Sequence, residues 1–172
     1  TFQAQATESQ LVATEAATLA KEALNSLKLA LSQHDAMVGI SETARAGLKN
    51  ILDNQSRIQS LALFEASPLG VKKLFNAQLS DAPVLDSATE MALHQSLQVP
   101  GAFSKQSYNF MNLSKVGGPP AIGILLADTE HRSPDGKFIA ALGLIPLSGF
   151  AKGISGSDIH LVTLDGLVLY SS

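Results

Sequence analysis

The chain has 172 residues, of which 45% are hydrophobic and 16% charged, and its formal net charge at pH 7 is −3. A domain of this size buries about 70% of the surface that its unfolded chain exposes, so it can form a core without a disulfide or a structural metal. The charges form no runs, which argues against disorder and against a nucleic-acid-binding surface, because such a surface needs clustered Lys and Arg. The absence of Cys excludes a thiol nucleophile and a Cys-based zinc site.

The first third of the chain is predicted to be helical. Small and aliphatic side chains recur at alternating intervals of four and three residues, which places them along one side of a helix. The seam residues are Ala13, Ala17, Ala20, Leu24, Leu27, Leu31, His34 and Val38, with His34 as a polar interruption. A continuous helix over residues 3–54 would be about 75 Å long, so part of it should protrude or pair. The alternative is a break near Gly39 and a second helix over residues 41–54, where Ser41 suits a helix start.

The pattern then changes from helical to extended. Residues 57–64 end in an unbroken apolar run, which predicts a strand covered on both sides. Ser87 and Glu90 have the spacing of a capping box, so a short helix should begin there and end near Leu97. Residues 103–113 alternate loosely between two faces and are predicted to form a strand.

The last third is predicted to be an antiparallel meander. Two apolar runs, residues 121–127 and 138–145, predict the strands of a hairpin. The order Ser-Pro-Asp-Gly at residues 133–136 suits a tight turn between them. A short helix over residues 147–154 and an extended segment over residues 159–170, interrupted by an Asp-Gly pair, complete the chain.

Residues 121–172 resemble the Cache family, the PAS-like sensor domains found outside the membrane in bacterial chemoreceptors, histidine kinases and nucleotide cyclases. The resemblance rests on the Ile-Gly-Ile-Leu-Leu run at 122–126, the Asp-Gly turn at 135–136, the second apolar strand with its short helix, and the Leu-Val-Thr-Leu-Asp-Gly-Leu-Val-Leu-Tyr segment at 161–170. The helical first third also fits, because these sensors begin with a long helix that follows a transmembrane segment. The Arg-and-aromatic motif of amino-acid-binding members is missing, which argues against an ordinary amino-acid ligand.

The resemblance implies an α+β fold in which a long N-terminal helix packs on a PAS-like antiparallel sheet. It divides the chain into a helix or helix pair at 1–56, a sensor domain at 57–158 and a terminal strand at 159–172, which in two-module members opens a membrane-proximal module. No apolar stretch reaches the roughly 18 residues that span a bilayer. Because the first residue is Thr1 rather than Met, we expect a fragment whose membrane anchor lies outside it.

The implied function is that of a periplasmic or extracellular ligand-sensing domain of an inner-membrane signalling protein. It would not be an enzyme and would carry no cofactor. A small-molecule ligand on the sheet would change the packing of the N-terminal helix, which requires different affinities for two states. The alternative is a protein-interaction or dimerisation module without a small-molecule ligand, in which the seam residues form a homodimer contact rather than packing on the chain's own sheet.

The candidate ligand site lies on the predicted strand at residues 103–113. Gln106, Tyr108 and Phe110 share one face of it, and aromatic walls with a few polar groups are typical of ligand sites. Asp128, at the end of the next strand, would add a charge. The alternative for this face is ordinary packing with a hydrogen-bonded Tyr.

Two other groups of residues are candidates, one for metal ligands and one for a catalytic triad. Asp128, Glu130, His131 and Asp135 offer oxygen and imidazole donors in one hairpin loop, but their spacing fits no named metal loop, so no metal is predicted. Ser155, Asp158 and His160 hold the residue types of a hydrolytic triad. They lack the G-x-S-x-G spacing of a nucleophile elbow, so no catalytic site is predicted.

Overall fold

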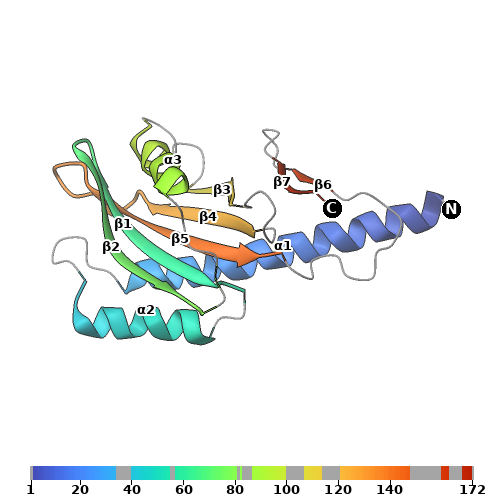
Figure 1. The fold of residues 1–172 in the computed structure, drawn as a ribbon, viewed down its shortest axis with the longest axis horizontal. Coiled ribbons are helices and arrows are strands. Elements are labelled where there is room, and N and C mark those ends of the chain that lie inside the picture. Colours follow the sequence, from blue (N-terminus) through green and yellow to red (C-terminus); the bar gives the residue numbers. More distant parts are fainter. Residues whose placement is uncertain are drawn as a thin grey trace.

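The computed structural model places two helices on one face of a five-stranded sheet and a third helix on the other face (Figure 1). Its described residues are 2–33, 40–54, 57–80, 82, 87–99, 107–113, 121–147, 160–162 and 168–171. The helices are α1 (Phe2–Ser32), α2 (Glu42–Asn54) and α3 (Ser87–Gln98). The α+β class and the long N-terminal helix on an antiparallel sheet, both predicted from the sequence, are confirmed.

The sheet has the strand order β2-β1-β5-β4-β3, and every neighbouring pair is antiparallel. Its strands are β1 (Ser60–Ser67), β2 (Gly70–Gln78), β3 (Tyr108–Asn112), β4 (Ala121–Asp128) and β5 (Phe138–Pro146). The three central strands are buried along almost their whole length because helices cover both faces, which explains their unbroken apolar runs. The predicted hairpin of β4 and β5 is confirmed.

The first third forms two helices rather than one. Helix α1 ends at Ser32 and α2 begins at Glu42. The prediction of two helices is therefore confirmed, and that of one continuous helix is wrong. The Ser41 hydroxyl accepts a hydrogen bond from the Ala44 backbone N–H at 3.1 Å, which is the expected cap of α2. His34 and Val38, the last two seam residues, lie outside the described residues.

The face of α1 that packs on the sheet is rotated by about one residue from the predicted seam. The buried residues are Leu19, Ala23, Ser26, Leu27 and Ala30, whereas Ala20, Leu24 and Leu31 of the seam are only partly buried. The small side chains at positions 23 and 30 allow the helix to approach β5 closely. At that approach the sheet carries Gly143, where an added Cβ would lie 3.0 Å from Leu27 Cδ2.

Strand β2 was not predicted from the sequence. Its alternation is interrupted by a bulge where β1 shifts register between Leu63 and Phe64, with Leu63 opposite Phe75 and Phe64 opposite Lys73. Leu74 is the extra residue of β2 at this bulge. Because of it, Lys73 and Phe75 lie on opposite faces of the sheet instead of on the same face. Phe75 lies in the core on the face covered by α1 and α2, while Lys73 lies on the α3 face and forms an ion pair with Glu90 of α3.

Helix α3 covers the second face of the sheet, and its predicted bounds agree with the structure. It buries Leu93 and Leu97 against a surface of small residues and aromatic rings that includes Ala62, Ala127, Phe64 and Phe138. The His94 ring packs edge-on against Phe64 at a centroid distance of 6.1 Å.

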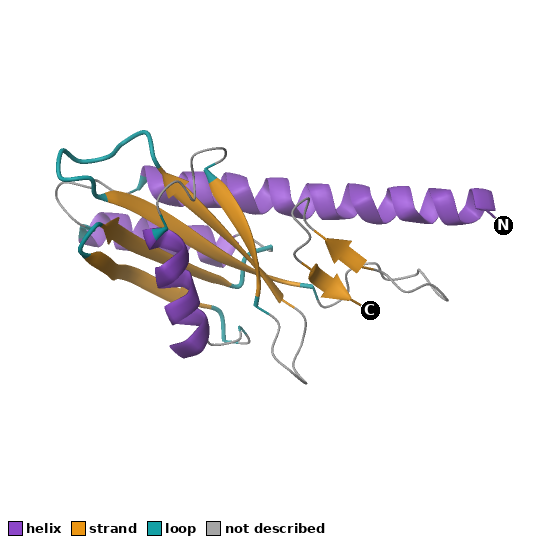
Figure 2. Ribbon diagram, turned by 90° about the horizontal axis from the view of Figure 1, so that it is seen from above, coloured by secondary structure: helices purple, strands orange, loops and turns teal. Residues whose placement is uncertain are grey.

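The end of the chain forms a second, two-stranded antiparallel sheet of β6 (His160–Val162) and β7 (Val168–Ser171). The single interrupted segment expected over residues 159–170 is therefore a hairpin. In Figure 2 this hairpin lies beside the sheet, and β7 is close to β3 and β4. The predicted helix over residues 147–154 falls outside the described residues after Leu147.

Candidate functional site

A groove of about 920 Å³ opens between the last turns of α1 and the loop that joins β4 to β5. Its walls also include Ser107, just before β3, and Ile139 at the start of β5. The volume lies within the roughly 300–1,000 Å³ that small-molecule sites occupy. The groove therefore joins the long helix and the sheet in one candidate site.

The pleat of the sheet explains which side chains reach this groove. Residues 122, 124 and 126 of β4 pack toward α1, so Asp128, two residues further, lies on the same face at the end of the strand. Tyr108 pairs with Leu126 and Phe110 pairs with Ile124. Paired residues of antiparallel strands share a face, so Tyr108, Phe110 and Asp128 lie together on the α1 face. Gln106, the fourth predicted site residue, lies outside the described residues.

Tyr108 and Phe110 contribute to packing rather than to the groove. Their rings meet edge to face at 5.7 Å with an interplanar angle of 83°, and both are partly buried against the core on the α1 face. Neither residue lines the groove. Of the predicted site residues that the structure describes, Asp128 alone forms part of its wall.

Asp128 holds the imidazole of His131 in a fixed orientation. The Nδ1 atom of His131 lies 2.9 Å from Oδ1 and 3.0 Å from Oδ2 of Asp128, and the His131 backbone N–H also donates to Oδ1 at 3.3 Å. An ionised carboxylate only accepts hydrogen bonds, so Nδ1 carries a hydrogen and Nε2 is left for another partner. The His131 side chain is 78% exposed and that of Asp128 is 28% exposed.

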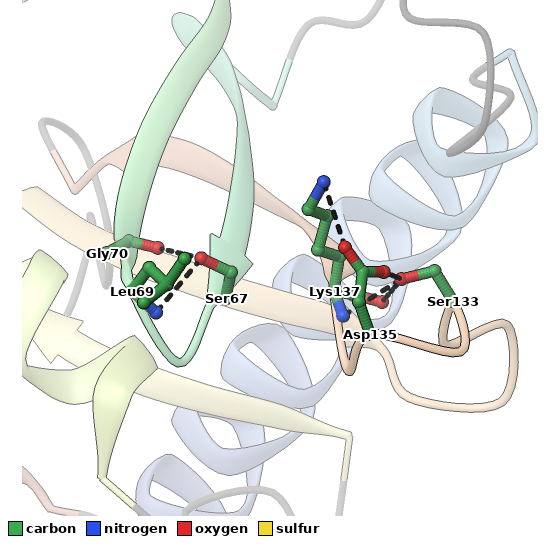
Figure 3. A network of polar contacts seen from close by, with 6 residues as sticks. All are labelled: Ser67, Leu69, Gly70, Ser133, Asp135 and Lys137. Carbon is green, nitrogen blue, oxygen red and sulfur yellow. Dashed lines mark hydrogen bonds and ion pairs between the residues drawn. The ribbon is translucent and has the colours of Figure 1, made fainter.

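The far end of the same hairpin is closed by the predicted Ser-Pro-Asp-Gly turn. The Gly136 N–H donates to the Ser133 carbonyl at 2.9 Å, and Gly136 has a φ of +79°, which favours glycine. Asp135 accepts a hydrogen bond from the Ser133 hydroxyl and pairs with the Lys137 ammonium at 3.0 Å (Figure 3). The Ser133 hydrogen bond, followed by Lys137, lowers the pKa of Asp135, and Asp135 raises the pKa of Lys137.

The β1–β2 turn lies beside this hairpin end. The Ser67 hydroxyl donates to the Gly70 carbonyl at 3.1 Å and accepts from the Leu69 N–H at 3.3 Å (Figure 3). The Pro68 ring is 3.8 Å from the position that a Cβ on Gly136 would occupy. The two turns therefore lie against each other at one end of the sheet. The loop that lines the groove runs from the end of β4 into the second of these turns.

The described residues bring no three His, Asp or Glu side chains into a group that could hold a metal ion. Asp128 and His131 contact each other, while Asp135 is engaged by Ser133 and Lys137. Of the triad residues weighed from the sequence, Ser155 and Asp158 lie outside the described residues.

Sequence reasoning missed the wall that α1 supplies. Lys28, Leu31 and Ser32 line the groove about 100 positions before Asp128 in the chain. No local motif marks them, because their role comes only from packing α1 across the ends of β4 and β5. His131 and Glu130 stood out in the sequence as metal-ligand types, which is the one signal that pointed to this loop.

In the described part of the chain, none of the helices has both the length and the apolar character required to cross a bilayer. No protein-family model matches the sequence, and no curated protein matches it either.

Proposed function

We propose that this chain is the ligand-sensing domain of a bacterial transmembrane signalling receptor, such as a chemoreceptor or a histidine kinase. In this proposal it lies in the periplasm or outside the cell, is anchored to the membrane in the full-length protein, and binds its ligand without converting it. Two observations support the proposal. Residues 121–172 follow the pattern of Cache domains, and a long helix packs on a five-stranded antiparallel sheet, as that resemblance implies.

The observation that carries the proposal is the shared wall of the groove. Lys28, Leu31 and Ser32 come from α1, whereas Asp128 and residues 129–134 come from the β4–β5 hairpin. A ligand held between these walls contacts the helix and the sheet at once. If it fits one relative position of the two better than another, its binding energy shifts α1 toward that position.

Helix α1 is suited to carry such a shift. It has 31 residues and so extends about 46 Å at 1.5 Å per residue. Its buried residues begin only at Leu19, so the half that precedes Leu19 continues past the sheet (Figure 2). In the proposed receptor this outer half leads toward the membrane anchor.

A thermal-shift screen tests the proposal. The purified chain is exposed to amino acids, organic acids, amines, nucleosides and divalent cations, because a ligand at 100 times its dissociation constant adds about 2.7 kcal/mol of stability. A compound that raises the melting temperature of the wild type should fail to do so with Ser107→Trp, which fills the groove. The matched control is Ser80→Trp, at an exposed turn outside the groove.

Hydrogen exchange then tests transmission. The compound should change amide exchange in α1 as well as in residues 129–134. A panel without any binder, or a binder that Ser107→Trp leaves unaffected, contradicts the proposal.

A protein-interaction or dimerisation module is the second candidate function, and the outer half of α1 favours it. Leu11 is 63% exposed there, and Ala13 and Ala17 line a shallow hollow on the same half. Leu11 and the hollow lie on different sides of the helix, so a homodimer through Leu11 should dissociate in sedimentation experiments on Leu11→Asp and one through the hollow on Ala17→Asp. The control is Leu29→Asp, because Leu29 is also an exposed leucine of α1 but lies on the half that packs on the sheet.

A further inference from the structure

Some polar side chains that line the groove already form hydrogen bonds or ion pairs within the protein, and others do not. Asp128 accepts the hydrogen bonds of His131, the Ser32 hydroxyl donates to the Leu29 carbonyl at 2.7 Å, and the Arg132 guanidinium stacks 4.6 Å from the centroid of Phe138. Asp128 and Ser32 are therefore engaged within the protein, whereas the ring contact of Arg132 does not use the N–H donors of its guanidinium. Among the described residues, no ion pair or hydrogen bond engages the Lys28 ammonium or the Nε2 atom of His131.

The free groups on the groove wall are mainly donors. Lys28 carries three N–H donors and no acceptor, and Nε2 of His131 donates to an anion when the ring carries a hydrogen on each nitrogen. The Ser107 hydroxyl adds a further donor from the residue just before β3. Against them stands one free carboxylate, that of the exposed Glu130. The Asp128 charge does not repel an anion to the same degree, because His131 covers both of its oxygens at 2.9 and 3.0 Å.

The rest of the wall is apolar. Leu31 of α1, Leu126 of β4 and Ile139 of β5 line the groove, and Leu126 and Ile139 are buried. A ligand that fills the groove therefore needs an apolar part as well as a charged end.

We propose that the groove binds a small organic acid, with its carboxylate between the Lys28 ammonium and Nε2 of His131 and its apolar part against Leu31, Leu126 and Ile139. This inference rests on the proposed sensing function and names the ligand class. Asp128 is a positioning residue in this arrangement, since it engages Nδ1 of the imidazole and leaves Nε2 for the ligand. Both anchors are needed because they come from the two elements, α1 and the hairpin loop, whose relative position the ligand would fix.

Matched probes test the charge of the ligand. Butyrate, hexanoate and succinate are compared by calorimetry with the corresponding neutral amides and with the alkylammonium ions of the same chain length. The acids should bind, whereas the amides and ammonium ions should bind at least 10-fold more weakly. Lys28→Met and His131→Asn should each weaken acid binding at least 10-fold. The control Lys49→Met removes an exposed lysine of α2 outside the groove and should leave it unchanged.

The other outcomes separate this inference from the function on which it rests. Tighter binding of ammonium ions or amides, weakened by Ser107→Trp, overturns the acid assignment and leaves the sensing function supported. Acid binding that is equal in wild type, Lys28→Met and His131→Asn also overturns the inference, because the anchors are then wrong. Failure of all three probe classes and of the broader thermal-shift panel contradicts the sensing function itself.

Discussion

The two halves of α1 belong to one helix but differ in what stabilises them. In the outer half the hydroxyls of Thr7, Thr14 and Thr18 donate to carbonyls one turn earlier, at 3.0, 2.8 and 2.9 Å, so these contacts stay within the helix. In the inner half, Ala23 and Leu27 are fully buried against the sheet. Since most helical stability in proteins comes from packing rather than from intrinsic propensity, the inner half contributes most to the fold, whereas the outer half packs on the core only through the partly buried Val12 and Ala16.

The difference also shows what alanine does in each half. Ala13 and Ala17 are exposed and make no contact with the core, while Ala23 and Ala30 are buried where α1 packs on the sheet. The repeat of small residues looks the same in both halves. Its structural role depends on the sheet, because alanines are fully buried against it only in the inner half.

The largest expected effect separates the two halves directly. Leu27→Ala should lower the free energy of unfolding by about 2–5 kcal/mol, because it empties a fully buried site. Leu11→Ala, at an exposed site, should change it by less than about 0.5 kcal/mol. Equilibrium urea unfolding of both variants measures the difference, and similar losses would contradict the division of α1 into two halves.

A smaller effect tests how closely the inner half approaches the sheet. In Gly143→Ala the new Cβ would lie 3.0 Å from Leu27 Cδ2 and 3.3 Å from Ile58 Cδ1. We expect a loss of about 1–3 kcal/mol from overpacking. The double variant Gly143→Ala with Leu27→Ala should lose less than the sum of the two single losses, since the smaller side chain relieves the contact. Additive losses would show that α1 does not press on this strand.

The edge of the inner half carries an ion pair whose contribution should be smaller still. Arg57 Nε lies 2.8 Å from Glu22 Oε2, and both side chains are nearly half exposed. A double-mutant cycle with Glu22→Gln and Arg57→Gln should give a coupling of at most about 1 kcal/mol, and it should fall when salt is raised. A coupling above that range, insensitive to salt, would mean that α1 is held by charge as well as by packing.

The smallest effect is expected at the Ser-Pro-Asp-Gly turn of the β4–β5 hairpin, where the ion pair of Asp135 with Lys137 stays within the hairpin. Because the pKa of Asp135 is lowered by Ser133 and Lys137, its contribution to stability is present above its ordinary value of 3.8 and is lost as pH falls through the lower folded value. Lys137 has the opposite sign: its contribution is present below 10.5 and is lost as pH rises through its raised value.

The variant Asp135→Asn tests these signs in urea unfolding measured across pH. Below about pH 4 the wild type should lose more stability on acidification than the variant does. Parallel pH profiles for the two proteins would show that this turn contributes nothing that titrates.

Much of the fold could be predicted because its signals are local. Ser87 and Glu90 mark the start of α3, and the Ser-Pro-Asp-Gly turn separates two apolar runs that became β4 and β5. Strand β2 could not be recognised by alternation, since the bulge at Leu74 places Phe75 and Lys73 on opposite faces. The ion pair of Lys73 with Glu90 depends on that bulge.

The candidate site was predictable only in part. Asp128 could be placed because it ends an apolar strand, and its face follows from the pleat. Tyr108 and Phe110 were placed on the correct shared face of the sheet, but there they pack, partly buried, against the core and do not line the groove. The sequence does not reveal how far along the sheet α1 extends, and that distance determines which part of the face stays open as a groove.

The strand order has a consequence for the order of folding. The β1–β2 and β4–β5 hairpins each join neighbouring stretches of chain, but the pairing of β1 with β5 at the centre of the sheet sets Ala62 opposite Leu142. Closing so long a loop is entropically costly and slow. The two hairpins should therefore form first and the central pair last, with α1 docking as β1 and β5 meet, because Leu27 packs where Ile58 and Gly143 come together.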